Sequence, residues 1–415
     1  MGMILRKGYR FRLKLRDGEE HKLAQFAGCC RFVWNRALAV QDELFRDEDQ
    51  KLLSRATLLN LLPNWKQEHS FLRETHSQIL QQALIDLDHA YQGFFRRLKK
   101  IRAGDFSEGE DPGYPCFKKK FVHDSFRFPQ GFRFEHRHVY LPKLGWFRFY
   151  KSREIEGVPK NVTVSRDGPH WYISVQVERE IPDPGPVREP STGVDMGVSR
   201  FYTCSSGTFS NPLNAFRFLE EKLAKEQRKL SRKVKFSSNW KKQKAKVAKV
   251  HRKIKNSRLD YLHKNSTALA KSYGRIYAEN LRVKNMSRSA SGTRENPGSN
   301  VGAKSGLNKS ILDQGWGEFF RQLEYKLYWR GGELIRVSPR DTSKTCSWCG
   351  YVSEHNRRSQ SKFVCEACGL EIHADQNAAI NIRTLGQRGM ACEANRPSGR
   401  QQEPLGNGDR VPAPA

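Results

Sequence analysis

Two Cys-x-x-Cys pairs stand near the carboxyl end of this 415-residue chain. The first pair is Cys346 and Cys349, and the second, after fifteen intervening residues, is Cys365 and Cys368. Each short spacing turns the backbone so that both sulfurs can face one ion, and two such turns supply the four thiolates that zinc prefers. Because four protein ligands leave no open position for a substrate, we expect one structural zinc ion. A redox pair is the alternative interpretation, and His373 is expected to lie outside the metal sphere.

Three acidic residues stand where predicted strands or helices begin or end. Asp195 follows an apolar strand in GVDMG, Glu279 ends the next apolar strand in IYAEN, and Asp375 begins the helix-like ADQNAAINI. Singly, each has a plain structural explanation, such as capping a turn or a helix. Together, they suggest joint coordination of two Mg²⁺ ions, with Mn²⁺ as an alternative metal. Such a pair activates water and stabilises the leaving oxygen of a phosphodiester, and it neutralises carboxylates that would otherwise repel one another.

The composition indicates a polyanionic partner. The chain has 74 Lys and Arg against 44 Asp and Glu, for a formal charge of +30 and a pI near 9.9. Nucleic acid is the partner that this excess favours, although ribosomal and membrane-surface proteins are also basic. No apolar run is long enough to cross a bilayer, so we expect no membrane partner.

The start of the chain reads as an alternating strand and not as a signal peptide. The remaining cysteines are scattered, as reduced thiols of a reducing compartment are. Both features predict a cytosolic protein. These cysteines are Cys29, Cys30, Cys116, Cys204 and Cys392.

A long basic region at residues 218–263 is predicted to form a helical hairpin with a break at residues 237–239. A solvated charged face is the simpler explanation, but so one-sided a run repels itself without an anion, which favours a surface that binds nucleic-acid backbone. Five apolar residues are expected to pack the two arms together: Leu223, Leu230, Val247, Val250 and Ile254. The basic residues include Arg228, Lys229, Arg232, Lys233, Lys235, Lys241, Lys242, Lys244, Lys246 and Lys249.

The pattern divides the chain into α/β domains. Residues 1–18 and 106–184 read as short strands of one small barrel, interrupted by a helical block at 19–105. In FRFPQGFRF, within the strand region, the aromatic residues either stack on nucleic acid or form core. A proline-rich linker near residue 185 marks a boundary. Beyond it we expect a strand-helix-strand domain at 190–342 and 372–390, interrupted by the zinc ribbon at 343–371, and a disordered tail at 391–415. Residues 287–306 are expected to form a mobile loop, and residues 311–332 an amphipathic helix closed by glycines.

Six motifs of the chain, in this order, resemble those of the TnpB (OrfB) family. They are GVDMGVSRF, IYAENLRVKNM, DQGWGEFFRQLEYK, SPRDTSKTCSWCG, FVCEACG and HADQNAAINI. CCRFVWNRAL and PKLGWFRFY are similar too, so the resemblance covers roughly residues 5–390. This family consists of transposon-encoded, RNA-guided DNA nucleases related to type V CRISPR effectors. The resemblance implies a RuvC-like, RNase H-type fold whose catalytic acids match Asp195, Glu279 and Asp375. The zinc ribbon then lies inside that fold, and a barrel ("wedge") is interrupted by a helical recognition domain.

The resemblance also implies partners. A guide RNA from the transposon end pairs with double-stranded target DNA beside a short motif that the protein reads, and we place that reading at Ser77, Gln78 and Gln81. The basic hairpin is expected to hold RNA and heteroduplex by shape and charge, with contacts at Arg228, Lys229, Arg232, Lys233, Lys241 and Lys242. The protein is expected to be a monomer of the prokaryotic cytosol or nucleoid.

Three alternatives to an RNA-guided nuclease stay open. One is a nuclease-independent, RNA-guided DNA-binding regulator, although the three acids are all present. Another is a transposase that itself joins DNA strands with an acid triad. The zinc insertion before the last acid argues against this alternative. The third is a structural RNA-binding protein.

Overall fold

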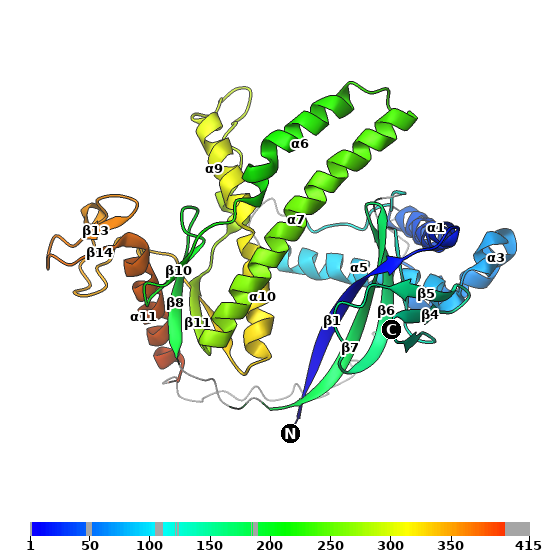
Figure 1. Ribbon diagram of the computed structural model, residues 1–415, viewed down its shortest axis with the longest axis horizontal. Coiled ribbons are helices and arrows are strands. Elements are labelled where there is room, and N and C mark those ends of the chain that lie inside the picture. Colours follow the sequence, from blue (N-terminus) through cyan, green and yellow to red (C-terminus); the bar gives the residue numbers. More distant parts are fainter. Residues whose placement is uncertain are drawn as a thin grey trace, which may run out of the picture. The chain divides into compact units, whose positions relative to one another are not determined.

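The computed structural model describes residues 2–46, 52–103, 111–120, 122, 124–183, 185 and 190–394, with side chains to residue 389. The chain divides into two compact units, Met1–Asp183 and Pro184–Ala415 (Figure 1). Of the predicted tail, the first four residues complete the last helix, and the rest lies outside the described residues. In the described part of the chain, no helix combines the length and the apolar character that crossing a membrane requires.

The first unit is built on a seven-stranded sheet in the order β2-β6-β7-β1-β5-β4-β3, with antiparallel neighbours throughout. Side chains alternate across its long strands, so that Tyr9 and Phe11 of β1 are buried and lie opposite Val175 and Ile173 of β7. The strands are β1 (Gly2–Lys14), β2 (Ser125–Phe128), β3 (Arg133–Glu135), β4 (His138–Leu141), β5 (Gly145–Phe149), β6 (Val158–Asp167) and β7 (His170–Pro182).

This sheet is open, and the structure does not show the closed barrel that the strand pattern predicts. Strands β2 and β3 form its edges and are not paired with each other among the described residues. Each is only three or four residues long, which leaves little backbone to form a closing ladder. The aromatic stretch FRFPQGFRF, which spans both strands and the turn between them, belongs to the core, since Phe126 and Phe128 are buried and Phe132 and Phe134 pack against the same cluster.

In the sequence, the segment between β1 and β2 forms helices. The two long ones present the apolar faces that their periodicity predicts: Leu23, Phe26 and Val33 of α1 are buried, as are Leu84 and Leu87 of α5. Both faces join one core with the sheet. The helices are α1 (Glu19–Arg46), α2 (Arg55–Asn60), α3 (Leu62–Glu68), α4 (Phe71–Glu74) and α5 (Ser77–Arg102).

The second unit contains a five-stranded sheet in the order β10-β9-β8-β11-β12. Strands β8, β9 and β10 form an antiparallel meander, whereas β11 runs parallel to β8 and β12 parallel to β11. The strands are β8 (Ser191–Met196), β9 (Tyr202–Cys204), β10 (Phe209–Ser210), β11 (Arg275–Glu279) and β12 (Glu333–Val337).

Helices cover both faces of this sheet (Figure 1). On one face, Val194 of β8 and Ile276 of β11 pack with residues of α7 (Ser238–Ser272) and α10 (Trp316–Tyr328). On the other, Tyr277 of β11 packs with Ile382 of α11 (Ala374–Ala394). The sheet is therefore the middle of three layers, and α11 is the helix on the side of the candidate site.

Helices α6 (Ala215–Ser231) and α7 form the predicted basic hairpin, and Ser237 caps α7 at the predicted break. Its two arms pack through apolar residues of both helices. Asp313 fixes the base of the hairpin: its buried carboxylate accepts the backbone N–H of Phe216 and Arg217 in α6 and pairs with Arg258 of α7 at 2.5 Å. The packed residues are Ala215, Leu219, Leu223, Val247, Val250 and Ile254, with Leu230 partly buried beside them.

Two expectations for residues 287–332 need correction. The predicted mobile loop begins directly after α8 (Val283–Met286), but its last residues are helical and form the start of α9 (Val301–Gln314). The predicted amphipathic helix at 311–332 is in fact parts of two helices, because Gly315 adopts a left-handed φ of 71° between α9 and α10. The apolar face of α10 is buried as predicted.

Candidate active site and metal centre

Asp195 and Glu279 lie at the same end of two neighbouring parallel strands. The register pairs Val194 with Ala278, so the next residues, Asp195 and Glu279, stand side by side. Side chains alternate along a strand, and both acids therefore project on the sheet face that also carries Gly193 and Tyr277, the face covered by α11. Two carboxylates from separate strands thus converge beside one helix.

Helix α11 reaches these acids because two glycines let it approach the sheet closely. A Cβ atom at Gly193 would lie 1.9 Å from the carbonyl oxygen of Ala379, and one at Gly386 would lie 2.0 Å from the ring of Tyr277. Both contacts are far shorter than real side chains allow. The first turn of α11, which bears Asp375, is thereby held against the end of β8.

Burial and mutual repulsion dominate the electrostatics of Asp195. Burial, and then the charges of Glu279 and Asp375, raise the pKa of Asp195 to about 8, while Arg357 opposes the shift. A buried carboxylate cluster of this kind favours a cation that replaces the missing solvation. These oxygen ligands fit hard divalent ions such as Mg²⁺.

Two neighbours hold Glu279 in place. The hydroxyl of Thr342 donates a hydrogen bond to its Oε1 at 2.5 Å, and the guanidinium of Arg336 donates to its backbone carbonyl at 3.0 Å. Arg336 itself stacks on Phe320, with 3.4 Å between the guanidinium carbon and the ring centroid. Burial raises the pKa of Glu279 and the Thr342 hydrogen bond opposes that rise.

Asp375 is flanked by two residues that precede it in the chain, Arg357 of the ribbon and His373 at the end of β14. A guanidinium nitrogen of Arg357 lies 3.6 Å from one carboxylate oxygen, and Nδ1 of His373 lies 3.8 Å from the other. Burial, followed by the charge of Arg200, lowers the pKa of His373, and its Nδ1 accepts the backbone N–H of Asp375 at 3.2 Å. The segment that carries the cysteines therefore also brings a cation into the acid cluster.

Two buried asparagines of α11 bind the chain segment at residues 342–347, which we call the approach segment. Asn377 donates to the carbonyl of Thr345 at 2.8 Å and accepts the N–H of Ser347 at 2.9 Å. Asn381, one turn further on, donates to the carbonyls of Thr342 and Thr345 at 2.9 and 2.7 Å. The approach segment thus links α11 to Thr342 and Glu279 on one side and to Cys346 on the other.

The four cysteines form a compact group whose sulfurs all lie within 4.8 Å of one another. Sulfur separations of 3.7 Å, between Cys346 and Cys368, and 3.6 Å, between Cys349 and Cys365, match the roughly 3.8 Å edge of a tetrahedron with ~2.3 Å zinc–sulfur bonds. The residues present therefore fit the predicted zinc ion. A two-stranded sheet, β13 (Lys362–Val364) and β14 (Glu371–His373), supports the second pair.

Both knuckles have the same backbone pattern. In the first, Cys346 donates its N–H to Tyr351 and accepts that of Gly350; in the second, Cys365 does the same with Leu370 and Gly369. The two glycines have left-handed φ values of 78° and 73°. This conformation explains why a glycine follows each Cys-x-x-Cys.

The carboxylates do not form so tight a cage. Among the described residues, the cysteines are the one set of three or more ligating side chains drawn together this closely. A wider spacing suits ligands that are shared between two ions about 4 Å apart better than ligands of one ion.

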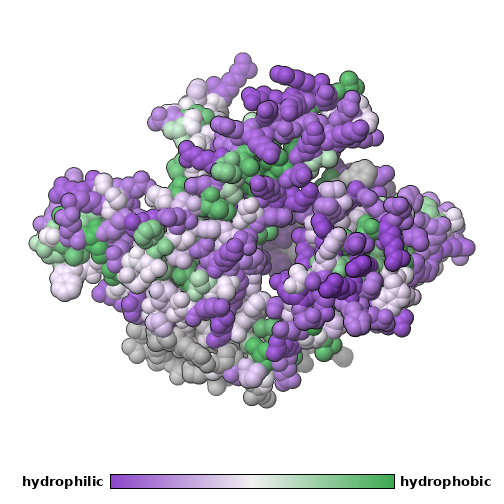
Figure 2. All heavy atoms as spheres, in the orientation of Figure 1, coloured by the Kyte–Doolittle hydropathy of each residue, from purple (hydrophilic) through white to green (hydrophobic). Residues whose placement is uncertain are grey.

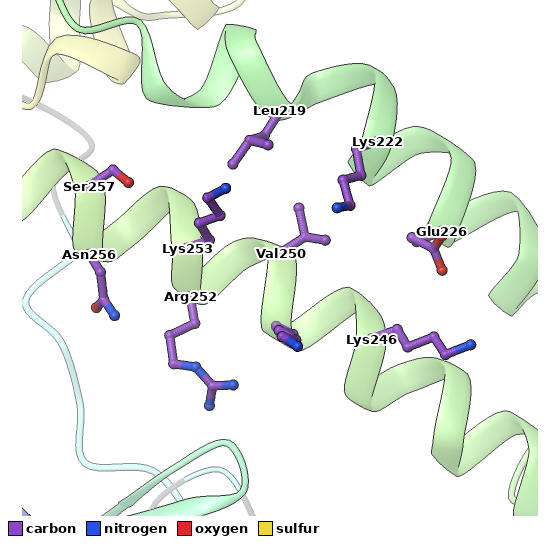
Figure 3. Close-up of a pocket in the computed structure, with 10 residues that line it drawn as sticks. Leu219, Lys222, Glu226, Lys246, Val250, Arg252, Lys253, Asn256 and Ser257 are labelled. Atoms are coloured by element: carbon purple, nitrogen blue, oxygen red, sulfur yellow. The ribbon is translucent and has the colours of Figure 1, made fainter.

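The basic hairpin presents its cations to solvent. Between Glu226 and Asp260 there are fourteen Lys or Arg residues and no Asp or Glu. A pocket of about 500 Å³ opens between its arms, where Leu219, Lys222 and Glu226 of α6 face Val250 and Lys253 of α7 (Figure 3). Hydrophilic residues cover most of the hairpin, with a small hydrophobic spot at its free end (Figure 2). All six hairpin contacts named from the sequence are exposed: Arg228, Lys229, Arg232, Lys233, Lys241 and Lys242.

The three polar residues that are predicted to read the motif beside the target lie together at the start of α5. Ser77 and Gln81 are exposed and Gln78 is half-buried. Ser77 accepts a hydrogen bond from the ammonium of Lys66 at 2.7 Å. A positive charge therefore stands beside these side chains.

Five residues around the acids are not among those predicted from the sequence: Thr342, Arg336, Arg357, Asn377 and Asn381. The sequence does contain a sign of Asn377 and Asn381. They are polar residues within an apolar stretch of the helix that begins near Asp375, and because they are four residues apart they lie on the same face of that helix. The roles of Arg357 and Thr342 depend on how the ribbon folds back, which their local sequence does not reveal.

Comparison with known proteins finds three family models that match the chain. Residues 172–290 match OrfB_IS605, described as "Probable transposase"; residues 316–382 match the "Cas12f1-like, TNB domain"; and residues 1–50 match a "Helix-turn-helix domain" of OrfB_IS605. Over the last stretch, the described residues form one strand and one long helix, β1 and α1, and not two helices.

Similar proteins match over nearly the whole chain. The Escherichia coli K12 protein named "Putative RNA-guided DNA endonuclease InsQ" is 46% identical over 404 residues, covering 96% of this chain and 97% of the relative. A Streptomyces pristinaespiralis protein named "Putative RNA-guided DNA endonuclease" is 31% identical over 396 residues, covering 94% of this chain and 91% of the relative. A solved Cas12f1–sgRNA–target DNA complex aligns at 18% identity and a TM-score of 0.33, covering 91% of this chain and 98% of that one.

Proposed function

This chain belongs to the TnpB (OrfB, IS605) family, and we propose that it is an RNA-guided, Mg²⁺-dependent DNA endonuclease encoded by a transposable element. It would cleave double-stranded target DNA beside a short adjacent motif, with a single RuvC-like active site. Its relatives InsQ and the Streptomyces protein both carry the name "Putative RNA-guided DNA endonuclease", which supports the RNA-guided endonuclease part of the assignment.

The observation that carries the proposal is the convergence of three acids from three separate elements. Asp195 and Glu279 project from adjacent parallel strands, and Asp375 from the helix that covers them. The sheet supports an RNase H-type fold, because a meander of three antiparallel strands is followed by two strands parallel to the first. When bound, two divalent ions would activate a water molecule and stabilise the leaving oxygen of the phosphodiester.

The residues around the acids have separate tasks in this proposal. Asp195, Glu279 and Asp375 would hold the two ions. Thr342 orients the Glu279 carboxylate, and Arg357 offers a guanidinium to the phosphate that is cut. The zinc ribbon would therefore serve the active site, since it delivers Arg357 and, through the approach segment, Thr342.

Guide and target binding would use both units. The hairpin α6–α7 offers the charge density that RNA and heteroduplex backbone require. In the first unit, the sheet would act as the wedge and the helices α1–α5 as the recognition domain. Ser77, Gln78 and Gln81, with Lys66 beside them, would read the motif next to the target.

The test starts from expression of the chain with its native downstream DNA. We expect one abundant RNA of defined end, mapping to the flank of the element, to co-purify in moderate salt. With Mg²⁺, the complex should cut a DNA that matches this RNA and carries candidate adjacent motifs, whereas Asp195→Asn should bind the RNA and not cut. Cleavage of transposon ends without RNA would overturn the proposal in favour of a direct transposase. RNA-guided binding without cutting by the wild type would favour a regulator.

A further inference from the structure

The free end of the α6–α7 hairpin carries an exposed aromatic residue in a strained backbone conformation. The side chain of Phe236 is 75% exposed, and its φ of 68° lies in the left-handed region. A bulky residue seldom adopts this conformation, and a glycine would do so without strain. Neither apolar burial nor backbone preference accounts for a phenylalanine here, and outliers of this kind gather at functional sites.

Phe236 is held by a second aromatic ring. Its ring centroid lies 5.5 Å from that of Trp240, with the planes inclined by 50°. The backbone of Trp240 is held in turn, because its N–H donates a hydrogen bond to the N-cap hydroxyl of Ser237 at 3.1 Å. The ammonium of Lys244 stands 5.0 Å from the centre of the indole ring. The outward side of Phe236 is thus a flat apolar surface on a fixed support, and we call Phe236 and Trp240 the tip platform.

Cations without acidic partners surround the tip platform. Five exposed residues flank it along the chain, and among the described residues no carboxylate pairs with any of them. Such a surface fits a single-stranded nucleic acid, because the cations can bind its phosphates and the aromatic ring can stack on an unpaired base. A duplex does not offer this, since its bases already stack on each other. The five residues are Arg232, Lys233, Lys235, Lys241 and Lys242.

We propose that the tip platform stacks an unpaired base of the guide RNA, in a loop or bulge of that RNA. The inference rests on the proposed binding of a guide RNA. RNA is the nucleic acid that accompanies the protein before any target is met, so it is the polyanion available to neutralise the hairpin throughout. RNA recognition of this kind depends on unstacked bases placed against aromatic side chains.

Phe236→Ala removes the ring, and Phe236→Trp keeps a stacking surface. The matched control is Phe218→Ala, which removes another largely exposed phenylalanine, 83% accessible, from the first turn of α6 in the same hairpin. The probe is the RNA that co-purifies with the wild-type protein, prepared by transcription. We expect Phe236→Ala to weaken its binding by about 5- to 100-fold, with Phe236→Trp near wild type and Phe218→Ala within about twofold. The slope of affinity against salt should not change, because no cation is lost.

Chemical probing locates the contact. One or two nucleotides in an unpaired part of the RNA should be protected by the wild type and become reactive in Phe236→Ala alone. A photoreactive thiouridine at that position should crosslink to the peptide that contains Phe236. Equal affinity and an unchanged probing pattern for Phe236→Ala would overturn the inference, while RNA-guided cleavage by the same variant would leave the proposed function intact. A pattern that changes only after target DNA is added would overturn it in favour of a DNA contact.

Discussion

The hydroxyl of Thr342 donates a hydrogen bond to the Glu279 carboxylate, with 2.5 Å between the two oxygens. Thr342 belongs to the approach segment that Asn381 of α11 also binds, only four residues before Cys346 of the zinc group. One short segment therefore joins a candidate catalytic acid, the helix of another and the zinc site. The metal-binding ribbon and the acid cluster form a single structural unit.

Replacing Thr342 by valine keeps the shape of the side chain and removes the donor. Because this hydrogen bond lowers the pKa of Glu279, its loss should raise that pKa further and disfavour the ionised ligand. We expect cleavage to fall about 10- to 100-fold and to recover partly at higher Mg²⁺ or higher pH. A Mg²⁺ titration of the cleavage rate measures this. Thr345→Val is the control, since its hydroxyl donates to the backbone carbonyl of Asp341 and not to a candidate acid. Equal losses in both variants would contradict the assignment.

Asp195→Asn should stabilise the metal-free protein. The folded-state pKa of Asp195 is raised to about 8, so between the ordinary aspartate range and that value the folded state keeps a proton that the unfolded state releases. Stability contributed by this group therefore falls as the pH rises through that window. The metal-free melting temperature of the wild type should drop more between about pH 5 and about pH 8 than that of Asp195→Asn. Added Mg²⁺ should restore the wild type only, and equal Mg²⁺ responses would contradict a metal site at Asp195.

Removal of zinc should abolish cleavage before it abolishes RNA binding. Without the ion, the ribbon loses the clamp that fixes the approach segment and Arg357, whereas the hairpin packs through its own apolar cluster. Cys349→Ser serves as the test and Cys116→Ser, an exposed thiol outside the group, as the control. Zinc content, RNA affinity and cleavage are measured on each. A zinc-free variant that cleaves at the wild-type rate would show that the ribbon does not position the site.

Gly193→Ala should displace α11. Its added methyl group would meet the backbone of Ala379, which cannot move without shifting the helix that bears Asp375. We expect a loss of about 1–3 kcal/mol in the free energy of unfolding, together with a fall in cleavage at saturating RNA. Gly302→Ala in α9 is the control, because nothing lies within 4 Å of the new Cβ and the change should be neutral or slightly stabilising. Wild-type stability of Gly193→Ala by denaturant unfolding would refute the close approach.

The sequence predicts the parts of this site that local pattern determines. An acid at the end of an apolar strand, such as Asp195 or Glu279, and a paired Cys-x-x-Cys are visible because a strand or a knuckle needs only a few neighbouring residues. Arg357 and Thr342 are not visible in this way, since they act on acids that are distant in sequence. The predicted barrel is not seen, because a barrel closes only if the two edge strands of the sheet pair with each other. The alternation of apolar and polar residues shows that strands form and does not show which strands pair.

An RNA-guided nuclease takes its sequence specificity from the RNA and not from the protein, so the decisive measurement exchanges only the guide segment of the co-purified RNA. The same protein preparation, with Mg²⁺, is given two DNAs that each match one of two guide segments and share the same flanking sequence. Each RNA should direct cutting of its own DNA alone, and Asp195→Asn should cut neither. Cutting at one fixed sequence whichever RNA is bound would contradict RNA guidance.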